Sequence, residues 1–215
     1  MARARTGDAA RLTAMAQRRP DVILVNGPSS AGKTTLCRAL QAAIDAPYLV
    51  TGFDDFVFMA APRYYRGADT ARQDAHDAFT ALGAEMAIVS PPGAPLAVEA
   101  RFGPVFRRLL DAMAPAVRSL VEAGNRVIFD HVLHDQAMAE SCRRAFAGLD
   151  LLSVGVTCPI EILEARERAR GDRVLGRARG LAAVVHGFVD YDLMVDTGAN
   201  SAEACVATIV TALQR

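Results

Sequence analysis

A glycine-rich loop between an apolar run and a helical segment constrains the fold of this chain more than any other feature. The run "DVILVNG" (residues 21–27) is rich in β-branched residues and ends in glycine, as a buried strand does. Helical spacing of apolar residues follows over residues 34–44. The loop between them, "GPSSAGKT" (residues 27–34), matches the phosphate-binding pattern G-x-x-x-x-G-K-[ST] in full. A strand, this loop and a helix in succession predict a phosphate-binding α/β fold.

The loop supplies most of the expected nucleotide-binding residues. Its glycines let backbone N–H groups turn toward phosphate oxygens, and the helix N-terminus adds a partial positive charge. We expect Lys33 to reach the β- and γ-phosphates of ATP, and the Thr34 hydroxyl to hold Mg²⁺. The residues expected to bind the nucleotide from this loop are Gly27, Ser29, Ser30, Ala31, Gly32, Lys33, Thr34 and Thr35.

Lys33 is the only lysine of the chain, since all other members of the 24 lysine and arginine residues are arginine. Arginine can serve wherever a surface cation is sufficient, so a retained lysine indicates a need for a compact ammonium group on a flexible stem. A planar guanidinium would not fit the phosphate loop. The position of Lys33 also excludes the guanine-specificity motif N-K-x-D, which weakens the alternative of a regulatory GTPase.

Strands and helices alternate along the rest of the chain. Further strands are expected at 46–55, 125–131, 149–158 and 191–197, and helices at 104–122, 135–147, 159–170 and 201–213. This alternation predicts one domain over residues 1–215, with a parallel sheet covered by helices on both faces. Residues 56–103 are the least regular part, and we expect them to form a substrate-binding insertion.

Aspartates follow two of these strands. Asp130 ends the apolar run "RVIFD", the place where a carboxylate binds Mg²⁺, so we expect it to share the metal with Thr34. Asp54 and Asp55 end the strand beside the phosphate loop, where a carboxylate can accept the proton of an acceptor hydroxyl. We favour Asp54 as this base. The roles of Asp55, His131 and His134 stay open.

Six arginines lie within residues 164–180, which we expect to form a lid over the triphosphate. Arg166, Arg170 and Arg173 fall on one face if the helix continues past Gly171. Such a face can stabilise charge in the transition state, so Arg170 and Arg173 are catalytic candidates and Arg166 is a nucleotide-binding candidate. A solvated arginine-rich helix is the alternative reading.

Charge and cysteine content argue against several classes of partner. The formal net charge is zero and no basic run occurs, so neither nucleic acid nor a membrane surface is expected as a partner. The four cysteines are far apart in sequence and form no C-x-x-C pair, which is typical of reduced thiols in a cytoplasmic protein. The sequence leaves the oligomeric state open, and a homo-oligomer is one state that it allows.

Five segments together resemble the chloramphenicol phosphotransferase-like family of P-loop small-molecule kinases: "LVNGPSSAGKTTL", "GFDDF", "RVIFDHVL", "RARGDRV" and "VVHGFVDYDLMVDT". The resemblance implies an α/β P-loop NTPase fold similar to nucleoside monophosphate kinases, with a doubly wound five-stranded parallel sheet and an arginine-rich lid. It also implies ATP-dependent phosphorylation of a hydroxyl on an antibiotic. The family's G-x-D pattern falls on Gly52 to Asp54, which supports Asp54 as the base, and the family's lid arginines match Arg170 and Arg173.

The sequence therefore predicts an ATP-dependent phosphotransferase with an alcohol acceptor, of the antibiotic-inactivating, self-resistance type. A metabolic kinase for a sugar acid, nucleoside or nucleotide is the close alternative. A nucleotide-binding regulatory NTPase is the more distant one. The sequence does not distinguish ATP from GTP.

Overall fold

The computed structural model describes residues 18–61, 64, 82–171 and 174–214. Within these ranges, five parallel strands form one central sheet in the order β2-β5-β1-β6-β7. Their bounds are β1 Val22–Asn26, β2 Tyr48–Gly52, β5 Arg126–His131, β6 Leu151–Thr157 and β7 Leu193–Asp196. Strands β2 and β5 lie on one side of β1, and β6 and β7 lie on the other. The chain passes from β1 to β2 on the first side and crosses later, from β5 to β6, to the second. The carboxyl end of β1 therefore lies at the switch point where such sheets bind ligands.

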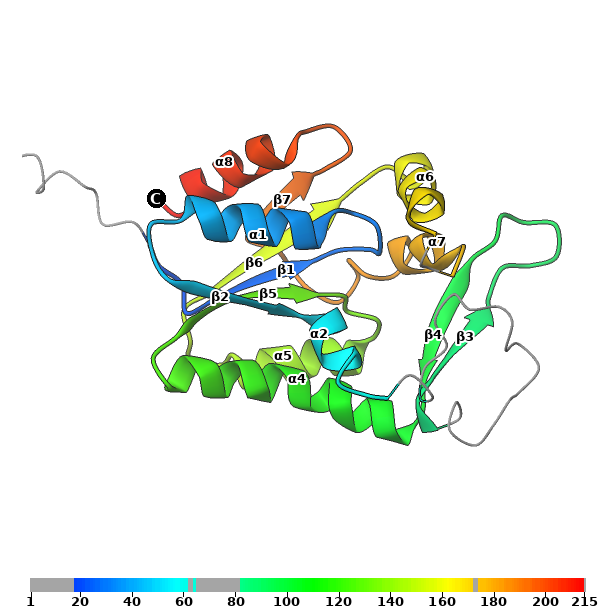
Figure 1. The fold of residues 1–215 in the computed structure, drawn as a ribbon, viewed down its shortest axis with the longest axis horizontal. Helices are drawn as coiled ribbons and strands as arrows, with labels where there is room; N and C mark the ends of the chain where they lie inside the picture. Colours follow the sequence, from blue (N-terminus) through cyan, green and yellow to red (C-terminus); the bar gives the residue numbers. More distant parts are fainter. Residues whose placement is uncertain (1–17, 62–63, 65–81, 172–173, 215) are drawn as a thin grey trace, which may run out of the picture.

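Helices cover both faces of this sheet (Figure 1). Helices α1 (Lys33–Ala43) and α8 (Ala202–Ala212) pack on one face, and α4 (Pro104–Glu122) and α5 (Gln136–Ala145) pack on the other. Successive residues of β1 contribute to opposite cores, because side chains alternate along a strand. Burial on both faces explains why the strands read as unbroken apolar runs. The expected doubly wound fold is confirmed.

Local signals fix several helix ends as the sequence suggests. The Ser201 hydroxyl accepts a hydrogen bond of 3.2 Å from the Ala204 N–H and caps α8. Gly124 has a φ of 90° just after α4, a conformation that glycine adopts readily.

Pro115 lies inside α4 and cannot donate to the Asp111 carbonyl, which instead accepts a hydrogen bond of 3.2 Å from the Ser141 hydroxyl of α5.

An antiparallel hairpin, which the sequence reasoning did not anticipate, lies within residues 56–103. It consists of β3 (Ala84–Ile88) and β4 (Val98–Phe102) and stands apart from the central sheet (Figure 1). It packs against helix α7 (Arg177–Ala182), where the Val98 N–H donates to the Gly176 carbonyl at 3.0 Å. A Cβ on Gly180 would lie 2.2 Å from the Val98 carbonyl oxygen, so the close packing requires glycine there.

The lid region differs from its expected form. Helix α6 (Ile160–Arg170) ends at Gly171, whose φ of 68° turns the chain away, and α7 is a separate helix. The end of α6 at Arg170 agrees with the predicted helix, and the condition under which all three lid arginines would share one face is not met. Arg173 lies outside the described residues. The buried carboxylate of Glu167 joins the two helices by accepting hydrogen bonds from the N–H groups of Gly176 at 2.8 Å and Ala178 at 2.7 Å.

The second expected strand also ends earlier than predicted. Strand β2 stops at Gly52, and a short helix, α2 (Phe53–Val57), follows at once. Asp54 and Asp55 therefore lie in the first turn of a helix rather than at the end of a strand. Because acidic residues favour helix N-termini, their local sequence is consistent with this outcome.

Candidate active site

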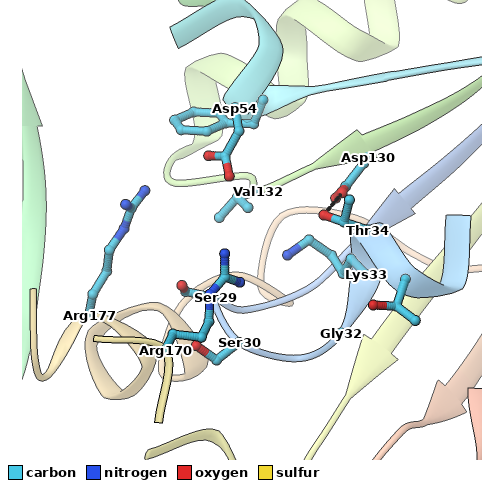
Figure 2. Close-up of a pocket in the computed structure, with 12 residues that line it drawn as sticks. Ser29, Ser30, Gly32, Lys33, Thr34, Asp54, Asp130, Val132, Arg170 and Arg177 are labelled. Atoms are coloured by element: carbon cyan, nitrogen blue, oxygen red, sulfur yellow. Dashed lines mark hydrogen bonds between the residues drawn. The ribbon is translucent and has the colours of Figure 1, made fainter. Parts of the chain in front are cut away.

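A pocket opens at the carboxyl edge of the sheet, where the phosphate loop, α2, the end of β5 and the lid meet (Figure 2). It is lined by Ser29, Ser30, Gly32, Lys33, Thr34, Thr35, Phe53, Asp54, Asp130, Val132, Arg170 and Arg177. The pocket thus brings together predicted residues from four separate segments of the sequence. Of the remaining candidates, Gly27 and Ala31 shape the loop from behind it.

Close packing of the phosphate loop on the sheet explains its glycines. A Cβ on Gly27 would lie 2.4 Å from the Val156 carbonyl oxygen of β6, so the loop can approach the sheet only with glycine there. Gly32 has a φ of 80° and Ser30 a φ of 65°, which turns the backbone N–H groups of the loop inward. The buried Lys33 ammonium donates to the Pro28 carbonyl at 3.0 Å, which holds this cation within the loop.

Thr34 and Asp130 form the expected metal pair. The Thr34 hydroxyl donates to the Asp130 carboxylate at 2.6 Å. Burial raises the pKa of the Asp130 carboxyl, and the Lys33 charge and the Thr34 hydrogen bond lower it in part. Among the residues that the structure describes, no cluster of three or more metal-binding side chains occurs. A site with one hydroxyl and one carboxylate fits Mg²⁺, which completes its shell with phosphate oxygens and water.

The two aspartates of α2 have different surroundings. Asp55 accepts hydrogen bonds from the Gly52 N–H at 2.8 Å and the Thr51 hydroxyl at 3.2 Å, and so caps the helix. Asp54 lines the pocket, and Figure 2 shows its carboxylate and the Lys33 ammonium pointing into the same space. A Cβ on Gly52 would lie 2.5 Å from the Asp130 carbonyl oxygen, so glycine lets β2 and β5 converge there.

The lid arginines divide between two places. Arg170 and Arg177 line the pocket, and Figure 2 shows both side chains reaching into it from the lid. Arg166 instead donates to the Thr197 carbonyl at 2.9 Å, beside Gly32 on the other side of the loop. Thr197 in turn donates to the Ala31 carbonyl at 2.7 Å. Sequence reasoning did not single out Arg177. The available signal was the high arginine content of residues 164–180, which include it.

Two histidines, the buried His131 and the half-buried His134, lie next to the pocket. His131 accepts a hydrogen bond of 2.8 Å from the Val132 N–H at Nδ1, and burial lowers its pKa to about 3. The His134 ring packs between Phe53 and Phe102, with centroid distances of 5.2 and 5.0 Å. Burial, followed by the charge of the Arg177 guanidinium, holds the pKa of His134 well below its usual value. Both rings are therefore neutral near pH 7.

Solved structures share the fold of this chain. A gluconokinase from Sinorhizobium meliloti superposes with a TM-score of 0.52 at 16% identity, covering 91% of this chain and 93% of the other. The tunicamycin resistance protein of Deinococcus radiodurans gives a TM-score of 0.55 at 13% identity, covering 89% and 94%. These similarities show that the chain has the fold of P-loop kinases. No helix in the described part of the chain is long and apolar enough to cross a membrane.

Sequence comparison identifies the family. Residues 20–214 match the family described as "Chloramphenicol phosphotransferase-like protein". The Mycobacterium tuberculosis protein "Putative O-phosphotransferase Rv2636" is 33% identical over 183 residues, which cover 83% of this chain and 75% of the relative. The chain therefore belongs to the chloramphenicol phosphotransferase-like family, and it is a phosphotransferase of the small-molecule kinase type.

Proposed function

We propose that this enzyme transfers the γ-phosphoryl group of ATP to a hydroxyl of an antibiotic-like small molecule. One observation carries the proposal: Lys33, Asp54, Asp130 and Arg170 come from four separate segments and line one pocket. Phosphoryl transfer requires mainly positioning and charge neutralisation, with one base for the acceptor hydroxyl. These four side chains supply those needs.

Each pocket residue takes a distinct role in this proposal. Asp54 accepts the proton of the attacking hydroxyl, because its carboxylate faces the space where the γ-phosphate would lie. Lys33 neutralises the β- and γ-phosphates from within the loop, and Arg170 stabilises the charge that develops on the transferred group. Arg173 keeps the same role from its family position.

Thr34 and Asp130 would hold Mg²⁺ beside the phosphates. When bound, the ion neutralises phosphate charge and fixes the geometry of the chain of phosphates. The carboxylate of Asp130 lies beside Lys33 and accepts a hydrogen bond from the Thr34 hydroxyl. Thr34 and Asp130 therefore meet at the place where such an ion would bind. Arg166 is placed to contact the nucleotide on the far side of Gly32.

Membership of the family supports an antibiotic as the acceptor, since the family takes its description from a chloramphenicol phosphotransferase. A specific observation favours the second candidate, a metabolic kinase for an acidic alcohol such as a sugar acid. Arg177 lines the pocket on the side of the hairpin, and its guanidinium would suit an anionic acceptor. The two candidates share one chemistry and differ only in the acceptor.

An assay of ADP release against a panel of antibiotics and hydroxylated metabolites tests the proposal. We expect one acceptor to gain the mass of one phosphate with Mg·ATP, and this product to be absent with Lys33→Ala. Phosphorylation of a metabolite alone would select the metabolic kinase. Loss of ATP without any phosphorylated product, from either half of the panel, would contradict the proposal.

A further inference from the structure

A group of five side chains, the acceptor-side cluster, lies between the pocket and the hairpin. Its members come from α2, β4, α4, the loop after β5, and α7, and they are Phe53, Phe102, Arg107, His134 and Arg177. Phe53 and Arg177 line the pocket directly. The other three do not line the pocket but pack next to Phe53: His134 contacts the rings of Phe53 and Phe102, and Arg107 contacts the ring of Phe102.

Two phenyl rings contact His134 and Arg107, two polar members of this cluster. The His134 ring lies 5.2 Å from the Phe53 ring and meets the edge of the Phe102 ring at 5.0 Å. The guanidinium carbon of Arg107 lies 5.6 Å from the centroid of the Phe102 ring. Aromatic contacts of this kind fix the position of an imidazole and a guanidinium in a partly dry environment.

Nε2 of His134 and Nη1 of Arg107 are buried, and neither atom has a hydrogen-bond partner among the described residues. The other terminal nitrogen of Arg107 donates to the Asp135 carboxylate at 2.8 Å, so the guanidinium is oriented while Nη1 is left over. Buried polar atoms nearly always have partners, and exceptions call for a ligand or a water. Two such atoms beside Phe53, a residue that lines the pocket, point to a ligand on this side of it.

The chemistry of this cluster selects an anion. Arg107 and Arg177 lie close enough to His134 for their charges to lower its pKa, in addition to the effect of burial. A neutral imidazole can carry its proton on Nε2, and guanidinium nitrogens only donate. The Asp135 carboxylate offsets part of the Arg107 charge, and Asp54 faces the pocket from α2. The cluster therefore offers several donors to an oxygen that accepts.

We infer that the acceptor-side cluster binds a carboxylate or phosphate group of the acceptor and so places a hydroxyl of the same molecule at Asp54. This inference rests on the proposed function and narrows its substrate to acidic alcohols. Phe53 and Phe102 supply an apolar wall beside the anion, which suits a ring or a short hydrocarbon. An acidic antibiotic and an acidic metabolite would both satisfy this site.

Calorimetric titration with simple probes tests the inference without turnover. The enzyme is saturated with Mg²⁺ and a non-hydrolysable ATP analogue, so that the phosphate loop is filled, and is titrated with benzoate, phenyl phosphate and neutral benzamide. We expect at least one anion to bind about tenfold more tightly than benzamide, because charge-assisted hydrogen bonds are the stronger ones. Tighter binding of benzoate would identify a carboxylate as the recognised group, and tighter binding of phenyl phosphate would identify a phosphate. Benzamide binding equally well, or no binding of any probe, would overturn the inference.

Two variants locate the binding. His134→Phe keeps a ring between Phe53 and Phe102 but removes Nε2, and Arg177→Met removes a guanidinium from the pocket. We expect each to weaken binding of the preferred anion about tenfold while affinity for the ATP analogue is unchanged. The exposed Arg168 of α6 provides a matched control, Arg168→Met, that should bind like wild type.

Unchanged anion affinity in both His134→Phe and Arg177→Met would also overturn the inference. Arg177→Met keeps the test decisive if His134→Phe does not fold. ATP-dependent transfer to a neutral alcohol, together with failed anion binding, would reject the acidic acceptor and leave the proposed function standing. Failure of the proposed function alone would instead appear as anion binding without any phosphorylated product.

Discussion

The hydroxyl of Thr34 donates a hydrogen bond of 2.6 Å to the carboxylate of Asp130, which lies 96 residues later in the chain. Parallel pairing of β1 with β5 sets Asp130 opposite Val25, just before the phosphate loop. The first turn of α1 and the end of β5 therefore meet at one point. This contact joins the two residues that we assign to Mg²⁺.

Replacing Asp130 with asparagine tests this assignment. Asp130→Asn can still accept from Thr34, so thermal stability should change little, but the metal loses its charged ligand. We expect turnover to fall about a hundredfold, because metal ligation contributes several kcal/mol to charge stabilisation in the transition state. Turnover measured across a Mg²⁺ titration checks this, with Thr34→Ser, which keeps a hydroxyl, as the control. Wild-type Mg²⁺ dependence in Asp130→Asn would reject the metal role.

The adjacent acids Asp54 and Asp55 should respond differently to mutation. Asp54→Asn should lower the rate of transfer about a hundredfold or more, with nucleotide affinity retained, because it removes the proposed base. Asp55→Ala should instead cost about 1 kcal/mol of folding stability, because it removes the cap of α2. Steady-state kinetics and denaturant unfolding of both variants separate the two effects. Normal transfer by Asp54→Asn would show that another group is the base.

Glu167 should stabilise the lid, although it does not contact the reacting groups. Its buried carboxylate accepts from two N–H groups at the start of α7, and the amide of Glu167→Gln can satisfy only one of them. We expect a loss of about 2 kcal/mol in stability and faster hydrogen exchange at Gly176 and Ala178. The exposed Glu161 on the same helix gives the control Glu161→Gln, which should lie close to wild type in both measurements. Equal exchange in the two variants would argue against this role.

Cys142 should be unreactive because burial raises the pKa of its thiol from 9.0 to about 12. Its alkylation in native protein should not accelerate between about pH 8 and pH 10, whereas the urea-unfolded chain should react faster as the thiolate forms. The folded pKa is raised, so no stability is lost below the unfolded value. As pH rises from 9 toward 12, stability should fall by up to about 1.4 kcal/mol per pH unit relative to Cys142→Ala. A parallel pH profile of the two proteins would contradict the burial effect.

Local sequence signals were sufficient for the sheet and the phosphate loop. Apolar runs predicted the five central strands, because strands buried on both faces require such runs. The loop pattern and a lysine found nowhere else in the chain then pointed to Lys33 and Thr34. Both residues line the pocket, as do Asp54, Asp130 and Arg170.

Contacts between distant segments explain what the sequence did not reveal. The hairpin depends on the fit of β4 against Gly180 of α7 and against Gly176, which precedes that helix, and no local pattern records this fit. The αL turn at Gly171 ends α6, so the continuous helix on which the three lid arginines would share a face does not form. Arg177 enters the pocket only because α7 is turned toward the hairpin. His134 was noticed, but its position between Phe53 and Phe102 is a product of tertiary packing.

The hairpin contributes no strand to the central sheet, and this has an evolutionary consequence. It lies in sequence between β2 and β5, yet Gly52 and Asp130 pair in a register that does not involve it. Insertions or exchanges between α2 and α4 can therefore alter the hairpin, including Phe102 of the acceptor-side cluster, while the phosphoryl-transfer residues keep their positions. A lineage of such enzymes could diversify its targets by remodelling one segment and inheriting the rest of the catalyst unchanged.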